Sequence, residues 1–335
     1  MTQTPPSHTP AQPADGSTDH AATGSPAVPT LQIPCQGGDL VVHDFTRVGV
    51  GPDAPLVLLV HGITANGLSW TATAEALAAD PATRGARIWA PDLRGRAGSR
   101  GLPGPYGLEA HVADLVAAAD HAGVEKVVLV GHSMGAFVAA LAGVAAPDRV
   151  AAEVLVDGGP AFPAPEDLDV DAALQAVIGP AMTRLSMRFA GAPGYLDFWR
   201  QHPAVGPLLA SPAGGAVTAY LLGDLVPAGD GSDEWVSSCV LDAIRADGRD
   251  VLADARTHGG ARAAAERGVP VEFIWAERGL MNEPTGLYDE QRIAALDLPA
   301  SIGVTGVPDV NHYSVLFEQP GIDAIVAAVG RVLSR

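Results

Sequence analysis

Gly131-His132-Ser133-Met134-Gly135 stands directly after the apolar run 126–130 and directly before a pattern typical of a helix. A serine in a tight turn between a buried strand and a helix projects its hydroxyl above the sheet. The two flanking glycines remove side chains that would collide with the neighbouring backbone. The amino end of the following helix favours negative charge beside the serine. The pentapeptide therefore predicts that Ser133 is a nucleophile at a strand-to-helix turn.

The segments around this turn alternate between strand and helix patterns. Apolar runs predict strands at 39–47, 55–60, 87–90, 126–130, 152–156, 271–275 and 301–305, and longer patterns predict helices near 68–79, 106–122, 134–146, 286–296 and 320–334. Short connections between alternating elements indicate an α/β fold with a mostly parallel sheet covered by helices on both faces. The segment 39–47 is predicted to be an edge strand of that sheet.

Two segments depart from the alternation. Residues 1–30 are rich in Pro, Ser, Thr, Ala and Gly, which predicts a disordered tail. Residues 160–250 are helical and loop-like, so we expect a helical cap or lid inserted into a core made of 31–159 and 251–335. This cap holds many of the chain's aromatic side chains. We expect most of them to form the cap's own small core and two or three to face an apolar pocket.

Composition bears on the partners of the chain. A net charge of −18 would repel nucleic acid and anionic membranes. No apolar run approaches the roughly 20 residues that a membrane span needs, and the N-terminus lacks the pattern of a secretory signal. Cys35 and Cys239 are too few for a disulfide framework or a thiolate metal site. We therefore expect a cytoplasmic protein with a small apolar substrate, and the sequence leaves a homo-oligomer open.

A second turn, His61-Gly62-Ile63-Thr64, follows the predicted strand 55–60. Together with the serine turn it resembles the α/β-hydrolase superfamily, and the resemblance extends from about residue 39 to the C-terminus. It implies an α/β-hydrolase fold with a cap, in which the backbone amides of Ile63 and Met134 form an oxyanion hole. It also implies that His61 is structural and is not the catalytic base.

The stretch 91–99 follows the next predicted strand and supports the same resemblance. It is similar to the superfamily's D-x-R-G-x-G-x-S motif, with Ala97 and Gly98 shifted relative to the usual glycines. We expect Asp92 and Arg94 to hold loops around the site, so this motif bears on the fold more than on the chemistry.

The catalytic base should come late in the chain, after the last strand. His312, within Val310-Asn311-His312-Tyr313, occupies that position. A histidine there can reach the serine hydroxyl while its other ring nitrogen meets a carboxylate. The other nine histidines lie in the tail or at unsuitable places in the topology, so His312 is the predicted base.

The carboxylate that orients this histidine is less sharply determined. The superfamily's commonest position follows the strand 271–275, but Gly279 stands there in place of the expected aspartate. Asp157 ends the neighbouring predicted strand, on a rigid element, and is the favoured candidate. Glu277 and Glu283, in the loop after 271–275, are the alternatives.

A serine nucleophile favours acyl transfer. The resemblance implies an enzyme that cleaves an ester or lactone of an apolar molecule through an acyl-enzyme, with no cofactor and no metal. Epoxide hydrolases and haloalkane dehalogenases of this fold use a carboxylate nucleophile instead. A C–C bond hydrolase or a haloperoxidase-like enzyme would use the same triad, and a non-catalytic receptor on this fold could also keep it.

Overall fold

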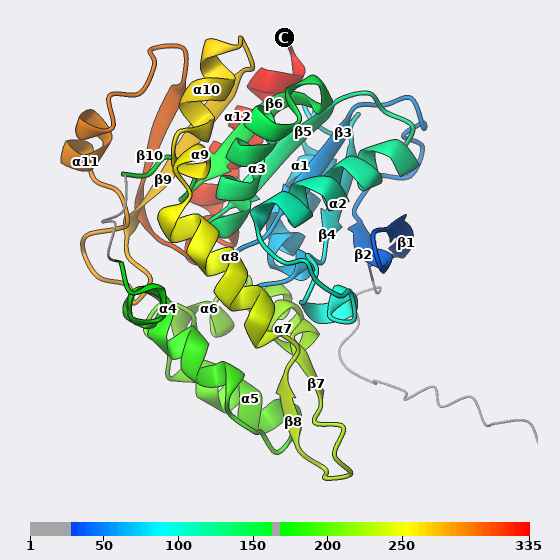
Figure 1. Cartoon of the computed structure of the whole chain (residues 1–335), viewed down its shortest axis with the longest axis vertical. Helices are drawn as coiled ribbons and strands as arrows, with labels where there is room; N and C mark the ends of the chain where they lie inside the picture. Colours follow the sequence, from blue (N-terminus) through cyan, green and yellow to red (C-terminus); the bar gives the residue numbers. More distant parts are fainter. Residues whose placement is uncertain (1–27, 163–167) are drawn as a thin grey trace, which may run out of the picture.

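The computed structural model describes residues 28–162 and 168–335. An eight-stranded sheet crosses the molecule in the order β1-β2-β4-β3-β5-β6-β9-β10 (Figure 1). The strands are β1 Thr30–Cys35, β2 Gly38–Asp44, β3 Leu56–Val60, β4 Arg87–Pro91, β5 Val127–His132, β6 Val150–Val156, β9 Val271–Arg278 and β10 Gly303–Asn311. β2 runs antiparallel to both of its neighbours, whereas the other pairs are parallel. The predicted α/β-hydrolase architecture with a mostly parallel sheet is confirmed.

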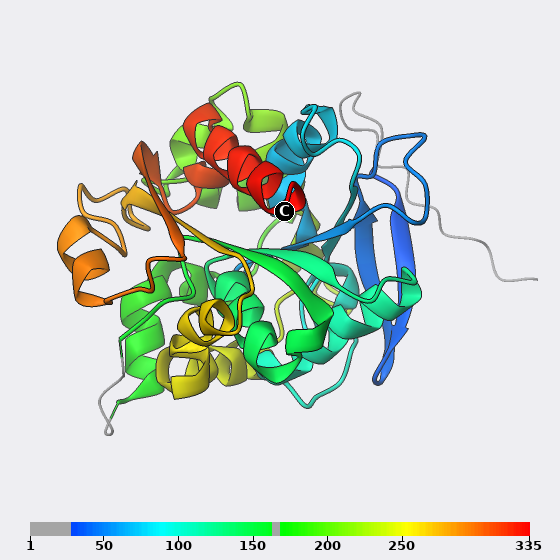
Figure 2. The same ribbon diagram turned by 90° about the horizontal axis from the view of Figure 1, so that it is seen from above.

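Helices cover both faces of the sheet (Figure 2). α2 (Leu108–His121), α3 (Met134–Ala145) and α10 (Gly260–Glu266) bury residues in a cluster on one face. α1 (Thr71–Ala79) and α12 (Gln319–Leu333) bury residues in a second cluster on the opposite face. The sheet is therefore the middle layer of three, and its strands are apolar on both sides.

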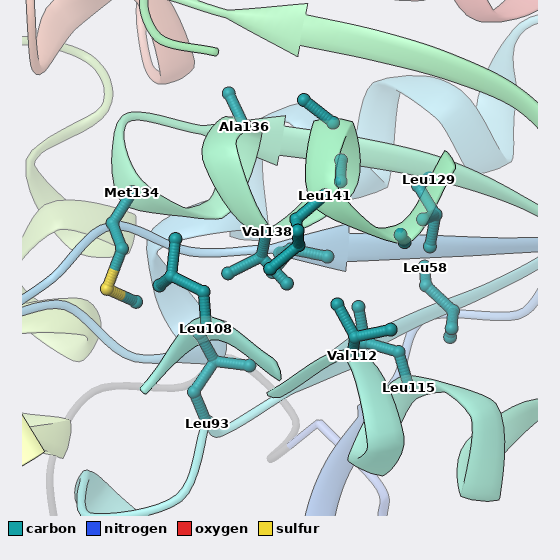
Figure 3. Close-up of a cluster of buried hydrophobic side chains, with 14 of the residues drawn as sticks. Leu58, Leu93, Leu108, Val112, Leu115, Leu129, Met134, Ala136, Val138 and Leu141 are labelled. Carbon is teal, nitrogen blue, oxygen red and sulfur yellow. The ribbon is translucent and has the colours of Figure 1, made fainter. Parts of the chain in front are cut away.

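The strand β3 shows why these runs fold as central strands. All five of its residues are buried, and alternate side chains point to opposite faces. Leu58 belongs to the cluster with α2 and α3, whereas Val57 and Leu59 belong to the cluster with α1 and α12. Figure 3 shows the first cluster, in which Leu58 lies opposite the α2 and α3 side chains and which extends to Met134 beside the serine turn.

The edge of the sheet differs from the prediction. The segment 39–47 was expected to be an edge strand, but β1 pairs along the outer side of β2. β1 contains Pro34, which cannot donate a ladder hydrogen bond and is tolerated at an edge, and it buries Ile33 completely. β1 begins at the last residue of the predicted tail 1–30; residues 1–27 lie outside the described part of the chain.

The insertion between β6 and β9 gathers at one end of the sheet (Figure 1). It contains α4 Val170–Leu185, α5 Gly191–Arg200, α6 Gly206–Leu209, α7 Gly214–Gly223, β7 Leu225–Pro227, β8 Trp235–Ser237, α8 Leu241–Ala253 and α9 Ala255–His258. β7 and β8 form a small antiparallel sheet that the sequence pattern did not indicate. The predicted cap boundary at residue 250 falls inside α8, which packs against both α4 and the core helix α3.

The aromatic side chains of this insertion pack mainly on one another. Phe189, Tyr195, Phe198 and Trp199 form edge-to-face contacts with ring centroids 4.8–6.3 Å apart. Such contacts stabilise a small core beyond the area that they bury. No helix in residues 28–162 and 168–335 is long and apolar enough to cross a membrane.

Candidate active site

The serine turn joins β5 to α3. Ser133 has a φ of +55° and a ψ of −122°, a sparsely populated backbone conformation that costs a non-glycine residue about 1–3 kcal/mol. A Cβ atom at Gly131 would lie 2.1 Å from the carbonyl oxygen of Gly135, and one at Gly135 would lie 2.0 Å from that of Val60. Both glycines are therefore required for the helix to begin this close to β3 and β5, which places the serine at the carboxyl end of the sheet.

His312 follows β10 and meets Asp157, which follows β6. His312 Nδ1 lies 2.6 Å from Asp157 Oδ2, and the carboxylate is fully buried. Asp157 Oδ1 also accepts a hydrogen bond from the Ala276 amide at 3.1 Å. Because a carboxylate only accepts, Nδ1 carries the proton in this pair. Nε2 is then the ring nitrogen left to accept a proton.

The other two candidate carboxylates are engaged elsewhere. Glu277 Oε2 accepts a hydrogen bond from the Asp309 amide at 2.8 Å. Glu283 Oε2 accepts one from the Met281 amide at 2.9 Å. The structure thus brings Asp157 to His312. Glu277 lies within β9, not in the loop after it, and contacts the backbone of β10, whereas Glu283 closes a local turn.

His132 adds a contact that the sequence pattern did not reveal. Its Nε2 donates to the backbone carbonyl of His312 at 2.8 Å, and the two ring centroids are 4.6 Å apart. Burial, and then the neighbouring His312, lowers the pKa of His132 well below its usual range. A neutral His132 therefore holds the backbone of His312 in place. The motif contains this residue, but no local pattern says where its side chain turns.

Two cavities meet at Ser133. The smaller, about 40 Å³, is lined by residues that include His312, Tyr220 and Phe317. The larger, about 460 Å³, lies within the range of small-molecule sites. Ser133, Ile63 and Ile178 line both cavities. Most of the other side chains around the larger cavity are apolar, and they include Phe137, Phe162, Leu174, Val251, Leu252 and Leu287.

Two backbone amides near Ser133 are available to an anion. Ile63 follows β3 and Met134 is the first residue of α3; both line the larger cavity with Ser133. Within the described part of the chain, neither amide donates to another backbone or side-chain acceptor. The first N–H groups of a helix have no partner inside it. These two amides can therefore stabilise negative charge that develops beside the serine.

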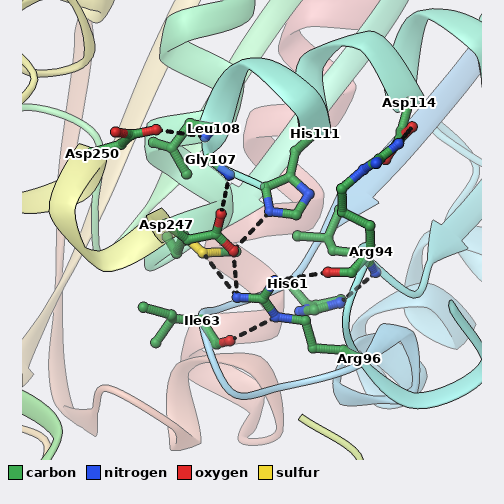
Figure 4. A network of polar contacts seen from close by, with 12 residues as sticks. His61, Ile63, Arg94, Arg96, Gly107, Leu108, His111, Asp114, Asp247 and Asp250 are labelled. Carbon is green, nitrogen blue, oxygen red and sulfur yellow. Dashed lines mark hydrogen bonds and ion pairs between the residues drawn. The ribbon is translucent and has the colours of Figure 1, made fainter. Parts of the chain in front are cut away.

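A buried ion pair anchors the turn that carries Ile63 (Figure 4). Arg96 donates to the Ile63 carbonyl at 3.0 Å and pairs with Asp247 of α8 at 2.6 Å. Asp247 also contacts His111 Nε2 at 2.9 Å. Although burial acts to raise it, His111 and Arg96 hold the pKa of Asp247 below its usual range. The pair thus ties helix α8 to the turn, through residues that the sequence analysis did not single out.

The motif residues Asp92 and Arg94 hold loops, as expected. Asp92 accepts hydrogen bonds from the amides of Gly67 at 2.8 Å and Gly98 at 3.0 Å. Arg94 pairs with Asp114 through two hydrogen bonds of 2.6 and 2.7 Å. Both side chains support loops next to the site without lining either cavity that contains Ser133.

The histidine of the second turn has a similar role. His61 Nδ1 donates to the Gly62 carbonyl at 2.8 Å, and its Nε2 accepts from the Leu93 amide at 2.9 Å. Complete burial lowers the pKa of His61 to about 3. A neutral His61 therefore joins the two loops through both ring nitrogens.

Neither cysteine competes with Ser133 as a nucleophile. Cys35 and Cys239 are free thiols, and burial raises their pKa values to about 11 and about 12. The thiol is the less reactive form. No group of three or more His, Cys, Asp or Glu side chains within residues 28–162 and 168–335 is arranged to hold a metal ion.

Comparisons with known proteins agree with this architecture. A family model described as "alpha/beta hydrolase fold" matches residues 55–179. The sequence is 42% identical to "Lipase LipV" of Mycobacterium tuberculosis over 108 residues, and this stretch makes up 32% of this chain and 39% of that protein. It is 41% identical to "Epoxide hydrolase A" of the same organism over 106 residues, and this stretch makes up 30% of this chain and 31% of that protein.

A solved structure is similar over a longer stretch. E-2-(Acetamidomethylene)succinate hydrolase superposes with a TM-score of 0.70 at 19% identity, over 92% of this chain and all of that chain. At this identity the likeness shows the fold alone. The two sequence relatives are matched over less than half of their length, and their names refer to different bonds.

Proposed function

Because this chain has the α/β-hydrolase fold and carries Ser133 at its strand-to-helix turn, we propose that it is a serine hydrolase of the α/β-hydrolase superfamily. Its substrate is an ester or lactone of an apolar small molecule, cleaved through an acyl-enzyme. The observation that carries this proposal is the 2.6 Å contact between His312 Nδ1 and Asp157. It fixes the tautomer in which Nε2 can take the serine proton.

Acylation begins when His312 Nε2 accepts the proton of Ser133 Oγ. The oxygen attacks the carbonyl carbon, and the carbonyl oxygen becomes an anion held by the Ile63 and Met134 amides. The buried Asp157 stabilises the imidazolium that forms. The anion then collapses, the bond to the leaving alcohol breaks, and His312 returns the proton to the alcohol oxygen.

Deacylation repeats the sequence with water. His312 removes a proton from a water molecule, whose oxygen attacks the acyl carbon. Collapse of the second tetrahedral anion breaks the bond to Ser133 Oγ, which regains its proton from the histidine. The products are a carboxylic acid and the free enzyme. The chain's own residues supply every group that these steps use.

The nucleophile separates this proposal from epoxide hydrolysis, which the name of one relative carries. Opening an epoxide on this fold uses a carboxylate at the turn, whereas this chain has the hydroxyl of Ser133. A hydroxyl activated by a histidine is suited to attack at a carbonyl carbon. The apolar lining of the larger cavity supports an apolar substrate.

The test combines covalent labelling with turnover. Wild type, Ser133→Ala and His312→Ala are treated with a fluorophosphonate probe, and the modified residue is located by mass spectrometry. Hydrolysis of short methyl esters and of γ- and δ-lactones is followed by proton release. Ser186→Ala is the matched control, because Ser186 is exposed and its hydroxyl only donates to the Thr183 carbonyl.

We expect labelling of Ser133 in the wild type and in Ser186→Ala, and turnover lowered by at least about 10³-fold in the other two variants. Well-folded wild type that neither labels nor hydrolyses an ester or lactone would contradict the proposal and favour a binding role. Labelling without turnover of either substrate class would point to another acyl bond.

A further inference from the structure

We propose that the two cavities divide the substrate at its ester bond. The larger cavity holds the acyl group and the smaller one holds the leaving alcohol. The preferred substrates are then esters of a bulky apolar acid with a small alcohol such as methanol or ethanol. This inference rests on the proposed function and adds which side of the ester carries the bulk.

The position of His312 decides which cavity receives the alcohol. In the proposed mechanism His312 must deliver a proton to the leaving oxygen, so that oxygen lies within hydrogen-bond reach of its ring. His312 lines the smaller cavity and is not among the residues around the larger one. The group attached to the leaving oxygen therefore continues into the smaller cavity, beside Tyr313 and Phe317.

The acyl group then extends the other way. Ser133 and Ile63 line both cavities, whereas Met134, the second amide for the anion, lines only the larger one. A carbonyl held by the two amides has two substituents, the leaving oxygen and the acyl carbon. With the oxygen placed beside His312, the acyl carbon points toward Met134 and the larger cavity.

The sizes of the cavities set the preference. The smaller one, about 40 Å³, has room for roughly three water-sized groups, which suits a methoxy or ethoxy group. The larger one, about 460 Å³, suits a medium-length or ring-bearing acyl group. Most of its lining is apolar, with Asp157, His258 and Arg292 as its charged or titratable members, and the apolar part favours hydrocarbon.

Ile178 lies where the two cavities meet. It lies in α4 at a break in the helix, with φ −124° and ψ 31°, and it lines both cavities. Pro180, two residues later, lacks the amide hydrogen that a continuous helix uses. The break in α4 thus lies at a residue that, like Ser133, lines both cavities.

Constitutional isomers test this division directly. Methyl nonanoate and octyl acetate have the same atoms but carry the long chain on opposite sides of the ester. We expect wild-type kcat/KM to favour methyl nonanoate by about tenfold or more, since each misplaced methylene group is costly. Methyl acetate is the control substrate, because both its acyl group and its alcohol are small and neither requires the larger cavity.

Two matched variants locate the acyl group. Leu252 is a partly buried leucine that lines the larger cavity, and Leu31 is a partly buried leucine of the edge strand β1 that lines neither cavity at Ser133. Leu252→Trp should lower kcat/KM for methyl nonanoate by about tenfold or more and for methyl acetate by less than about twofold. Leu31→Trp should change neither by more than about twofold.

The outcomes separate this inference from the proposed function. A preference for octyl acetate, or equal losses in Leu252→Trp for both methyl esters, would overturn the division while the serine hydrolase stands. Turnover of methyl acetate with no turnover of methyl nonanoate would also overturn it. Failure of wild type to hydrolyse every ester and to label at Ser133 would instead reject the proposed function, and the division with it.

Discussion

Replacing Asp157 with asparagine probes the carboxylate with almost no change in shape. In the structure Oδ1 accepts the Ala276 amide at 3.1 Å and Oδ2 contacts His312 Nδ1 at 2.6 Å. An asparagine has only one oxygen for these two donors. If it keeps the Ala276 hydrogen bond, its NH₂ group faces His312, whose Nδ1 must then be the acceptor. The proton moves to Nε2, and the histidine can no longer take the proton of Ser133.

The alternative orientation is costly as well. Turning the amide oxygen toward His312 restores the active tautomer but leaves the buried Ala276 N–H without an acceptor. That costs about 1–3 kcal/mol, which lowers the active population by roughly 5- to 150-fold. The variant has also lost the negative charge that stabilises the imidazolium. A triad aspartate replaced in this way lowers kcat by about 10⁴-fold, and we expect Asp157→Asn to lose about 10³- to 10⁴-fold.

The assay is steady-state hydrolysis of a methyl ester, normalised to the fraction of Ser133 that fluorophosphonate labels. Glu277→Gln and Glu283→Gln are matched acid-to-amide controls, because their carboxylates accept backbone amides, of Asp309 and Met281, and do not contact His312. Both should stay within about threefold of wild type. Circular dichroism checks that all three variants are folded.

Two results would refute this reasoning. One is an Asp157→Asn enzyme, folded and labelled, that keeps more than about a tenth of the wild-type kcat. The other is a Glu277→Gln or Glu283→Gln enzyme that loses as much activity as Asp157→Asn. Either would show that His312 is oriented by another group during turnover.

Further predictions concern stability. Ser133→Gly should raise the free energy of unfolding by about 1 kcal/mol over Ser133→Ala in urea titrations, because glycine tolerates the φ of +55°; equal stabilities would contradict strain at the turn. Burial lowers the pKa of His61 to about 3, so the unfolded chain takes up its proton first as the pH falls. The stability that neutral His61 contributes to the free energy of unfolding is complete above pH ~6.5 and declines toward pH ~3, with a loss of about 2 kcal/mol at pH 5. The His61→Asn variant should lack this part of the decline in stability. Asp247→Asn leaves Arg96 buried without its counter-charge and should cost about 3–5 kcal/mol. Asp254→Asn, which removes a pair with the exposed Arg256 and keeps an oxygen for the cap of α9, should cost under about 1 kcal/mol.

Local patterns were sufficient for the central strands of the sheet and for the serine turn. Apolar runs such as 55–60 and 126–130 are short and uninterrupted because both faces of a central strand are buried. The glycines of the turn are readable because the close approach of α3 to β3 admits no side chain. The predicted edge was wrong because the pattern of β1 includes a proline, and a proline weakens a strand signal without forbidding an edge strand.

The sequence did not show equally well which side chains meet around Ser133. Sequence order placed Asp157, Glu277 and Glu283 at comparable positions, and only the packing of β6 beside β9 showed which carboxylate meets His312. The buried pair of Arg96 with Asp247 joins two distant segments of the chain. A hydrogen bond across such a separation leaves no periodic mark on either segment, because neither residue needs its partner to form its own helix or loop.

The sequence by itself determined the fold class, the serine turn and the late histidine, since these follow from hydrophobic period, glycine sterics and chain order. The tertiary structure decided the carboxylate at His312, the contact from His132 to the His312 backbone, and the two unequal cavities beside Ser133. Those features are distances between side chains on separate elements. They depend on how the sheet twists and where the helices of the insertion come to rest, which no local stretch of sequence specifies.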